Sequence, residues 1–268
     1  MEGRVGGELE PIFECRDLDY SINLPTGPRR ILDGITLDVY RGEFLTIVGG
    51  SGTGKTSLLR LLGGLTRTTG GSICFRAKAV DGPPDGVVVV FQDYSHALLQ
   101  WRTVIDNVAL GLEGRVVATT LRERVTKALE MVGLQHCASD YPWQLSGGMQ
   151  QRVQIARALA LQPEVLMMDE PFGALDAMTK AILQDELLRV HRDTGTSFVF
   201  ITHDIDEAVY LGDRVIVLGG SPGRIYKSIS IKLPRPRDQI TSRQAAAFLA
   251  YRAEIHAAVR ESTRSDGY

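Results

Sequence analysis

The chain has 268 residues, of which 44% are hydrophobic, and a formal net charge of −2. This apolar content suits a packed domain and excludes a disordered chain, and the nearly neutral charge offers no general affinity for nucleic acid. Three scattered cysteines without a CxxC pair (Cys15, Cys74 and Cys137) exclude a disulfide framework and a zinc site and predict reduced thiols in the cytosol.

The start of the chain, residues 1–10, is rich in Gly and Glu and lacks the basic start and apolar run of a signal peptide. The longest apolar stretches, such as residues 87–91, are far too short to cross a bilayer. We therefore expect a chain that is soluble by itself, so that any membrane process it serves needs another chain as the channel.

Two strands are predicted near the start, at residues 12–20 and 31–40, separated by a turn rich in Pro and Gly. In the second strand, Ile35, Leu37 and Val39 alternate with polar residues, as they do on a half-exposed antiparallel sheet. We expect these strands to form an antiparallel β subdomain.

A continuous apolar run at 44–48 predicts a buried strand, and a Gly-rich loop and a helix at 57–62 follow it. Helical patterns also occur at 150–161 and 178–191. Further short apolar runs, each bounded by turn signals, lie at 87–91, 165–168, 197–201 and 215–218. Buried strands interleaved with helices predict a parallel, doubly wound α/β core.

Two stretches are predicted to be additions to this core. Residues 103–140 have a mostly helical pattern, which predicts an inserted helical subdomain spanning roughly 96–150. After a break at 234–238, apolar residues recur at helical spacing: Phe248, Tyr251, Ile255 and Val259. We expect a main domain at 12–243 and a helical tail at 244–268 that packs on it.

A Gly-rich loop follows the strand at 44–48. Its residues match the pattern GxxxxGK[ST]: Gly49, Gly50, Ser51, Gly52, Thr53, Gly54, Lys55 and Thr56. The glycines let several backbone N–H groups point inward, and the positive end of the following helix adds to the attraction for a polyphosphate. Lys55 can reach the β- and γ-phosphates, and Thr56 can place its hydroxyl on Mg²⁺. A Gly-rich turn without a ligand is the alternative, and the strand and helix on either side argue against it.

The apolar run at 165–168 ends in two acids, Asp169 and Glu170. Acids at the carboxyl edge of a parallel sheet face the ligand crevice. Asp169 is therefore predicted to hold Mg²⁺, usually through water, and Glu170 to orient or deprotonate the attacking water. The alternative is a pair of solvated acids at the start of a loop. The presence of the phosphate loop in the same chain argues against this alternative.

Residues 145–152 read Leu-Ser-Gly-Gly-Met-Gln-Gln-Arg. In this segment Ser146 can cap a helix, while Gly147 and Gly148 expose N–H groups to an anion. The segment resembles the LSGGQ-type signature of ABC ATPases, which in that family contacts the γ-phosphate bound by the opposite subunit. An ordinary Ser-Gly-Gly helix start is the alternative, and the order of the surrounding residues argues against it.

The resemblance to ABC ATPases covers residues 12–259 and implies roles for further positions. Gln92 resembles the Q-loop glutamine that touches Mg²⁺ and senses the membrane partner, and His203 resembles the switch histidine near the γ-phosphate. Asp176, in Ala-Leu-Asp, resembles the D-loop residue that crosses the dimer interface. Tyr20 lies where the family places an aromatic ring on adenine, although a Tyr at the end of a strand often serves only in packing.

Among ABC ATPases, the chain resembles the importer subunits for nitrate, sulfonate and taurine. The similarity lies in residues 91–93 followed by 98–101, and in residues 233–238 leading into an amphipathic helix. Three positions depart from the residues usual in importers without removing a group that performs chemistry: Gly50, Thr53 and Gln100.

The resemblance implies a P-loop NTPase fold with a RecA-like parallel core, an antiparallel β subdomain and an inserted α-helical subdomain. It implies an ATP-hydrolysing subunit that uses ATP and Mg²⁺ and forms a homodimer or pairs with a second ATPase subunit. Such a subunit lies on the cytoplasmic face of the membrane and energises transmembrane permease subunits. A solute-binding protein acts with it indirectly, and no nucleic acid is involved.

Three rival functions stay open: an ABC ATPase acting on ribosomes or DNA, a P-loop kinase, and a non-catalytic nucleotide-binding regulator. Proteins of the first class usually carry two ATPase domains, a coiled coil or zinc modules, which this sequence does not show. A kinase has no use for the signature or for residues 174–176. A regulator does not need both Glu170 and His203.

Overall fold

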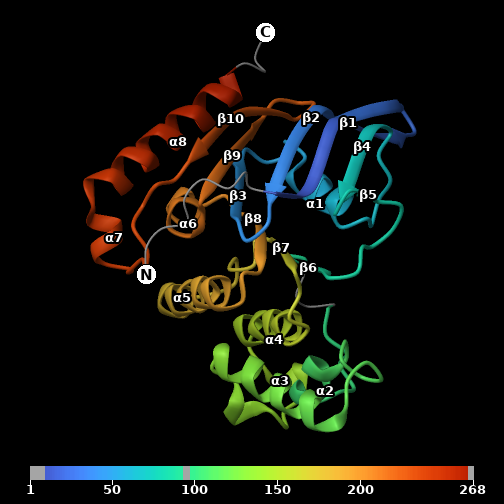
Figure 1. Ribbon diagram of the computed structural model, residues 1–268, viewed down its shortest axis with the longest axis vertical. Coiled ribbons are helices and arrows are strands. Elements are labelled where there is room, and N and C mark those ends of the chain that lie inside the picture. The colour runs from blue at the N-terminus through green and yellow to red at the C-terminus, as the bar shows by residue number, and fades with distance from the viewer. Residues whose placement is uncertain (1–9, 93–96, 265–268) are drawn as a thin grey trace.

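The computed structural model describes residues 10–92 and 97–264 (Figure 1). Four parts of the sequence predictions therefore lie outside the described residues. These are the start of the chain at 1–9, Asp93 in the segment 91–93, position 96 at the start of the helical insert, and the end of the tail at 265–268.

A six-stranded sheet forms the centre of the protein, with the strand order β10-β9-β3-β8-β7-β6. Its strands are β3 (Phe44–Gly49), β6 (Val87–Val90), β7 (Val165–Asp169), β8 (Ser197–Ile201), β9 (Arg214–Gly219) and β10 (Arg224–Ser230). All neighbouring pairs are parallel except β9 and β10, which pair antiparallel at one edge. The predicted parallel α/β core is confirmed, and the antiparallel edge strand β10 adds to it.

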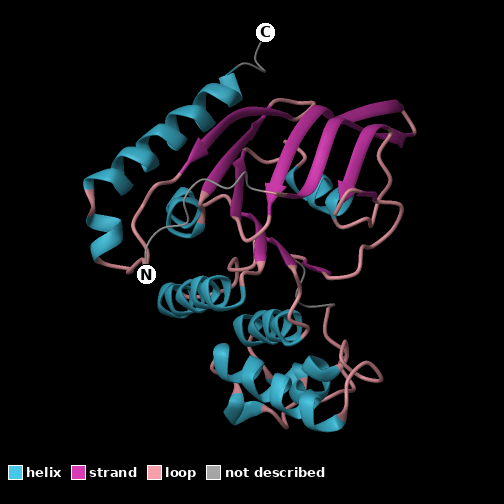
Figure 2. Ribbon diagram, in the orientation of Figure 1, coloured by secondary structure: helices cyan, strands magenta, loops and turns pink. Residues whose placement is uncertain are grey.

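Helices cover the sheet and also form a separate body at the bottom of the view in Figure 2. They are α1 (Lys55–Leu62), α2 (Val104–Ala109), α3 (Ala118–Met131), α4 (Gly147–Ala160), α5 (Ala177–Thr194), α6 (Ile205–Leu211), α7 (Thr241–Gln244) and α8 (Ala246–Arg264), with short 3-10 helices η1 (Gln135–Cys137) and η2 (Pro142–Gln144). The separate body consists of α2 and α3 packed on α4. Within the described residues, none of these helices combines the length and apolar character needed to span a bilayer.

The central sheet separates two apolar clusters because successive side chains of a strand point to opposite faces. On β8, Phe198 and Phe200 belong to one cluster, whereas Val199 and Ile201 belong to the other, and all four are fully buried. The first cluster includes residues of α4, α5, α6 and α8, and the second includes residues of α1. Burial on both faces explains why the core strands read as continuous apolar runs.

A second, four-stranded sheet packs against the α1 side of the core, with the order β2-β1-β4-β5 and antiparallel pairing throughout. Its strands are β1 (Pro11–Leu24), β2 (Gly27–Tyr40), β4 (Gly70–Phe75) and β5 (Lys78–Ala79). The predicted antiparallel subdomain is therefore present, with its first two strands longer than the apolar alternation indicated.

The end of the chain returns to the core as β10, α7 and α8 (Figure 1). In α8, Phe248 and Ile255 are buried, and Tyr251 and Val259 are partly buried against the first cluster. The helix contacts α6 and β9. The helical spacing predicted for the tail thus corresponds to the packed helix α8. The boundaries of the main domain (12–243), the tail (244–268) and the helical insert (96–150) stay predictions.

Candidate active site

The phosphate loop joins β3 to α1 at the carboxyl end of the sheet, and its path depends on glycine. A Cβ atom at Gly49 would overlap the backbone carbonyl oxygen of Leu218 on β9. Gly54 has a φ of 88° and would place a Cβ atom 2.6 Å from Leu32 Cδ2. Because Gly54 is the N-cap of α1 and has no side chain, the first N–H groups of the helix are left for an anion.

The tip of the loop is open, while its second half is tied down. Ser51 and Gly52 are exposed. Thr53 is buried, and its Oγ1 donates a hydrogen bond of 2.9 Å to Gly50 O. The exposed tip is the part that a large ligand can approach.

Lys55 is buried at the start of α1, and its ammonium group turns back to the loop. Its Nζ donates to Gly49 O at 2.9 Å and to Gly50 O at 2.8 Å. Burial lowers the pKa of Lys55, and the negative charges of Glu170 and Asp169 act in the opposite direction. A cation among the N–H groups of a helix start makes this loop a site for a polyphosphate.

Asp169 ends β7 and lies beside Thr56, the second residue of α1. Asp169 is almost fully buried, and its pKa responds to hydrogen bonding from the nearby Thr56 side chain. Burial raises the pKa of Asp169, and the bond from Thr56 partly offsets that rise. A carboxylate next to a hydroxyl supplies the oxygen donors that Mg²⁺ prefers in proteins.

Glu170 brings two other predicted site residues together. Its Oε2 lies 3.1 Å from His203 Nδ1 and 3.4 Å from Gln92 Nε2. Glu170 has a φ of 46°, which is uncommon for a residue with a side chain, and its backbone N–H donates to Ile201 O at 3.0 Å. Since Gln92 follows β6, Glu170 follows β7 and His203 follows the end of β8, the cluster gathers side chains from three adjacent strand ends.

Tyr20 is partly buried on β1 and pairs with Leu32 of β2. Leu32 in turn lies where a Cβ atom of Gly54 would be. Tyr20 is therefore placed on the part of the antiparallel sheet that borders the phosphate loop. Its contact with adenine stays a prediction.

The signature residues Ser146, Gly147 and Gly148 begin α4 in a separate cavity of about 390 Å³. Ser146 is the N-cap of the helix, and its Oγ accepts a hydrogen bond of 3.3 Å from Met149 N. Among the described residues that line this cavity, none belongs to the phosphate loop. The chain therefore presents two distinct helix starts suited to an anion.

The predicted D-loop, residues 174–176, lines the same cavity as the signature. Asp176 is the N-cap of α5, and its Oδ1 accepts from the N–H groups of Met178 and Thr179 at 3.0 Å each. Gln151 of α4 accepts from Ala174 N at 3.2 Å. The D-loop is thus fastened to the signature helix, and Asp176 has a capping role in addition to its predicted one.

Two polar side chains of α4, which the sequence did not predict as part of the site, hold the Q-loop segment. Gln154 Nε2 donates to Phe91 O at 3.2 Å, and Arg157 Nη1 donates to Ala97 O at 2.7 Å. These bonds fix α4 to both sides of the segment that contains Gln92. The only sequence signal is the presence of polar residues three apart on the inner face of a largely apolar helix.

A Gly-rich loop with a buried lysine, an acid pair after the neighbouring strand and polar side chains at the adjacent strand ends define a P-loop nucleoside triphosphatase. The protein-family profile described as ABC transporter matches residues 32–173, which include the phosphate loop, the signature and the acid pair. The chain belongs to the ABC transporter family. It is the ATP-binding, ATP-hydrolysing subunit of a transporter of this family.

Curated relatives agree with this assignment over most of their length. The chain is 50% identical over 227 residues to an uncharacterized ABC transporter ATP-binding protein, MJ0412, of Methanocaldococcus jannaschii, covering 84% of this chain and 83% of that protein. It is 43% identical to the bicarbonate transport ATP-binding protein CmpD of Synechococcus elongatus (86% and 84% covered). It is 38% identical to the nitrate transport protein NasD of Klebsiella oxytoca (87% and 90% covered).

Solved structures show the same fold. The ATP-binding cassette MJ0796, in a dimeric post-hydrolysis state bound to ADP and Pi, matches with a TM-score of 0.75 and 29% identity, covering 82% of this chain and 99% of the other. The protein cbiO1 from Clostridium perfringens, part of the ABC transporter complex cbiONQ, matches with a TM-score of 0.73 and 30% identity, covering 83% and 90%. The predicted ABC ATPase fold is confirmed.

Proposed function

We propose that two copies of this chain, or this chain and a second ATPase subunit, close head to tail around two ATP molecules and drive a membrane permease. The observation that carries this proposal is the separation of two anion-binding helix starts within one chain, at α1 and at α4. A cassette that matches this chain was solved as a dimer, which supports the pairing. Each ATP then lies between the phosphate loop of one copy and the signature of the other.

One half of each site holds the nucleotide. The N–H groups of residues 49–54 and the first turn of α1 surround the phosphates, and Lys55 places its charge on the β- and γ-phosphates. Tyr20 stacks on adenine. The polar contacts that Lys55 makes with the loop carbonyls are exchanged for contacts with phosphate oxygens.

The same half has donors for a magnesium ion. Thr56, Asp169 and Gln92 offer a hydroxyl, a carboxylate and an amide, and the contact between Thr56 and Asp169 supports their use as a common donor set. When bound, Mg²⁺ neutralises charge that develops on the phosphate oxygens.

Hydrolysis depends on the side chains at the strand ends. Glu170 orients a water molecule and accepts its proton, and Gln92, within 3.4 Å of that carboxylate, helps to fix its position. His203 holds the γ-phosphate. Loss of the γ-phosphate removes the charge that joins the two copies, so they separate.

The other half of each site comes from the second copy. Ser146, Gly147 and Gly148 direct the N–H groups of α4 to the γ-phosphate. Asp176 crosses the interface beside them. Because Gln151 fastens residues 174–176 to α4, signature and D-loop move as one unit.

The membrane partner is a permease at the cytoplasmic face. The body formed by α2, α3 and α4 passes the motion on, since α4 is tied to both sides of the segment that contains Gln92. Trp101 and Trp143 are 75% and 69% exposed and give this body an apolar surface for a partner.

The resemblance to importers and the names of the nitrate and bicarbonate relatives favour uptake of a small solute of the nitrate, bicarbonate, sulfonate or taurine kind. A separate solute-binding protein and the permease select that solute.

The partner can be identified by copurification from cells. A tagged Glu170→Gln chain, which should stay paired with ATP, is purified from solubilised membranes beside a tagged Lys55→Ala control, which should not close. The proposal predicts an integral membrane protein that copurifies with the first variant in larger amount. Recovery of ribosomes or DNA, with no integral membrane protein, would contradict it in favour of the non-transport alternative.

A further inference from the structure

The helix α6 connects the predicted switch histidine to the tail of the chain. It has only seven residues, and His203 lies two residues before its first residue. Asp204 caps its start by accepting from Asp206 N at 2.9 Å and from Glu207 N at 3.3 Å. A shift of so short a helix therefore moves His203, because only the cap residue separates them.

The far end of α6 is held by two arginines from the segment before α7. The side chain of Arg237 is 1% exposed, and its Nη1 donates to Tyr210 O at 2.7 Å and to Val209 O at 3.4 Å. Arg235 Nη2 donates to Leu211 O at 3.5 Å. The last three carbonyl groups of the helix thus face guanidinium groups, which satisfies acceptors that have no partner within a helix.

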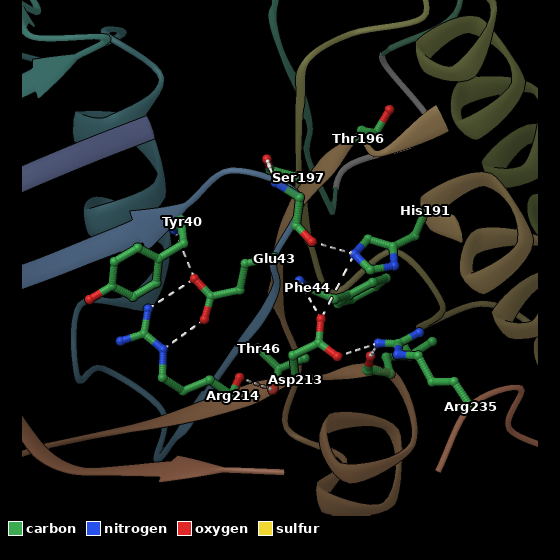
Figure 3. Close-up of polar contacts among 12 residues, drawn as sticks. Tyr40, Glu43, Phe44, Thr46, His191, Thr196, Ser197, Asp213, Arg214 and Arg235 are labelled. Atoms are coloured by element: carbon green, nitrogen blue, oxygen red, sulfur yellow. Dashed lines mark hydrogen bonds and ion pairs between the residues drawn. The ribbon is translucent and has the colours of Figure 1, made fainter. Parts of the chain in front are cut away.

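Within the part of the chain that the structure describes, the helix has no other strong C-terminal cap. Gly212 follows it in an extended conformation (φ −72°, ψ 143°), so it does not form the left-handed cap that glycine often provides. Arg237 remains charged at neutral pH, since burial lowers its pKa only to about 10. Arg235 is anchored in turn by Asp213, whose Oδ1 lies 2.5 Å from its Nη2 (Figure 3).

The tail also reaches the start of α6. Arg252 of α8 lies 3.7 Å from Asp206 Oδ1. His203 itself lines a cavity of about 920 Å³ whose other wall is α8, with Arg252 and His256 among its lining residues. The segment before α7 holds the end of α6, and helix α8 contacts its start, so both ends of the helix that follows the switch are fixed by later parts of the chain.

We infer that Arg237, assisted by Arg235, is a positioning residue for ATP hydrolysis: it fixes α6 and thereby sets where His203 lies relative to Glu170. This inference rests on the proposed role of His203. Arg237 does not itself touch the site, so it acts on the rate of turnover and not on nucleotide binding by the phosphate loop.

The test compares kcat and KM for ATP in the full chain, corrected for the fraction of protein that binds nucleotide. Arg237→Met should lower kcat roughly 2- to 30-fold and leave KM within about twofold. Arg237→Lys, which keeps a cation for the carbonyl groups, should recover part of the loss. Lys227→Met is the matched control, because Lys227 pairs with Glu254 at 2.8 Å and so joins β10 to α8.

A merely structural role is separated from positioning by a double-mutant cycle with His203→Ala. If Arg237 acts through His203, Arg237→Met should cause no further loss of kcat in the His203→Ala chain. Wild-type kcat in Arg237→Met, or the same fold loss in both backgrounds, would overturn the inference. Should Arg237→Met fail to fold, Arg235→Met is put through the same cycle and the same outcomes decide.

The same cycle distinguishes failure of the Arg237 inference from failure of the proposed role of His203. If His203→Ala keeps the wild-type kcat, the proposed role of His203 is wrong and the inference falls with it. If His203→Ala lowers kcat while the arginine variants do not, the inference alone is wrong.

Discussion

His203 Nδ1 lies 3.1 Å from Glu170 Oε2, so the segments after β8 and β7 meet through one side-chain contact. The His203 side chain is 72% exposed, whereas that of Glu170 is 20% exposed. The contact therefore joins a sheltered carboxylate to a group that faces outward, on the side where a second copy is proposed to close.

Glu170→Gln should lower the rate of ATP hydrolysis by about 10²- to 10⁴-fold, because the amide cannot accept a proton from water. The amide is of nearly the same size, so nucleotide binding should persist. Single-turnover hydrolysis and a nucleotide titration measure the two effects. Glu164→Gln is the matched control, since Glu164 precedes β7 just as Glu170 follows it and pairs with the surface arginines Arg41 and Arg76. Hydrolysis at the wild-type rate in the Glu170 variant would show that another group activates the water.

Lys55→Ala should act on binding itself. The variant removes a charged donor from the phosphates, which corresponds to about 10- to 100-fold weaker nucleotide affinity. Equilibrium titration with a fluorescent ATP analogue gives the Kd. An unchanged Kd would mean that the backbone N–H groups alone hold the triphosphate.

His191 predicts a pH dependence of folding. It is largely buried, and its Nε2 lies 3.0 Å from Gly42 O. The same nitrogen lies 3.8 Å from Asp213 Oδ2 (Figure 3). Burial lowers its pKa below the ordinary 6.5, although the charge of Asp213 opposes this. As the pH falls through 6.5 toward the lowered pKa of the folded state, the unfolded chain binds more protons at His191 than the folded chain does. The stability of the folded state therefore falls as the pH drops through this range.

The measurement is the free energy of unfolding in urea at about pH 7.5 and about pH 5.5, on either side of the ordinary histidine pKa. His191→Phe should lose less stability over this interval than the wild type, by at most about 1.4 kcal/mol per pH unit for one proton. The exposed His136→Phe should behave like the wild type. An equal loss in the His191 variant and the wild type would contradict the assignment.

The central sheet was predictable because its strands are buried on both faces. The runs at 44–48, 165–168 and 197–201 are almost wholly apolar for that reason, with Thr46 and Ser197 as the polar exceptions, and they correspond to β3, β7 and β8. The strands β4, β5 and β10 carry no such signal. β4 contains two glycines and a serine, β5 has two residues, and β10 is an edge strand with mostly exposed positions. Their existence depends on neighbours far away in the chain.

The candidate site also has one part that the sequence predicts and another part that it does not. The phosphate loop is continuous in sequence, so its pattern alone specifies a strand, a turn and a helix around one ligand. Gln92, Glu170 and His203 are far apart in the chain, and their meeting follows from strand order, which only the family resemblance supplied in advance. The contacts of Arg157 and Arg237 were not predictable, because both donate to backbone carbonyl groups, which every residue has.

Mixing two impaired variants tests most directly whether each ATP site is shared between copies. Lys55→Ala disables the phosphate loop, and Gly148→Asp places a carboxylate where the signature should meet the γ-phosphate; circular dichroism checks that both chains fold. In a mixed dimer, one site then combines an intact loop with an intact signature. The proposal predicts that the mixture hydrolyses ATP at up to about a quarter of the wild-type rate and clearly faster than either variant alone. Half of randomly formed dimers are mixed, and each mixed dimer has one intact site of two. A mixture no more active than its separate components would contradict the shared site.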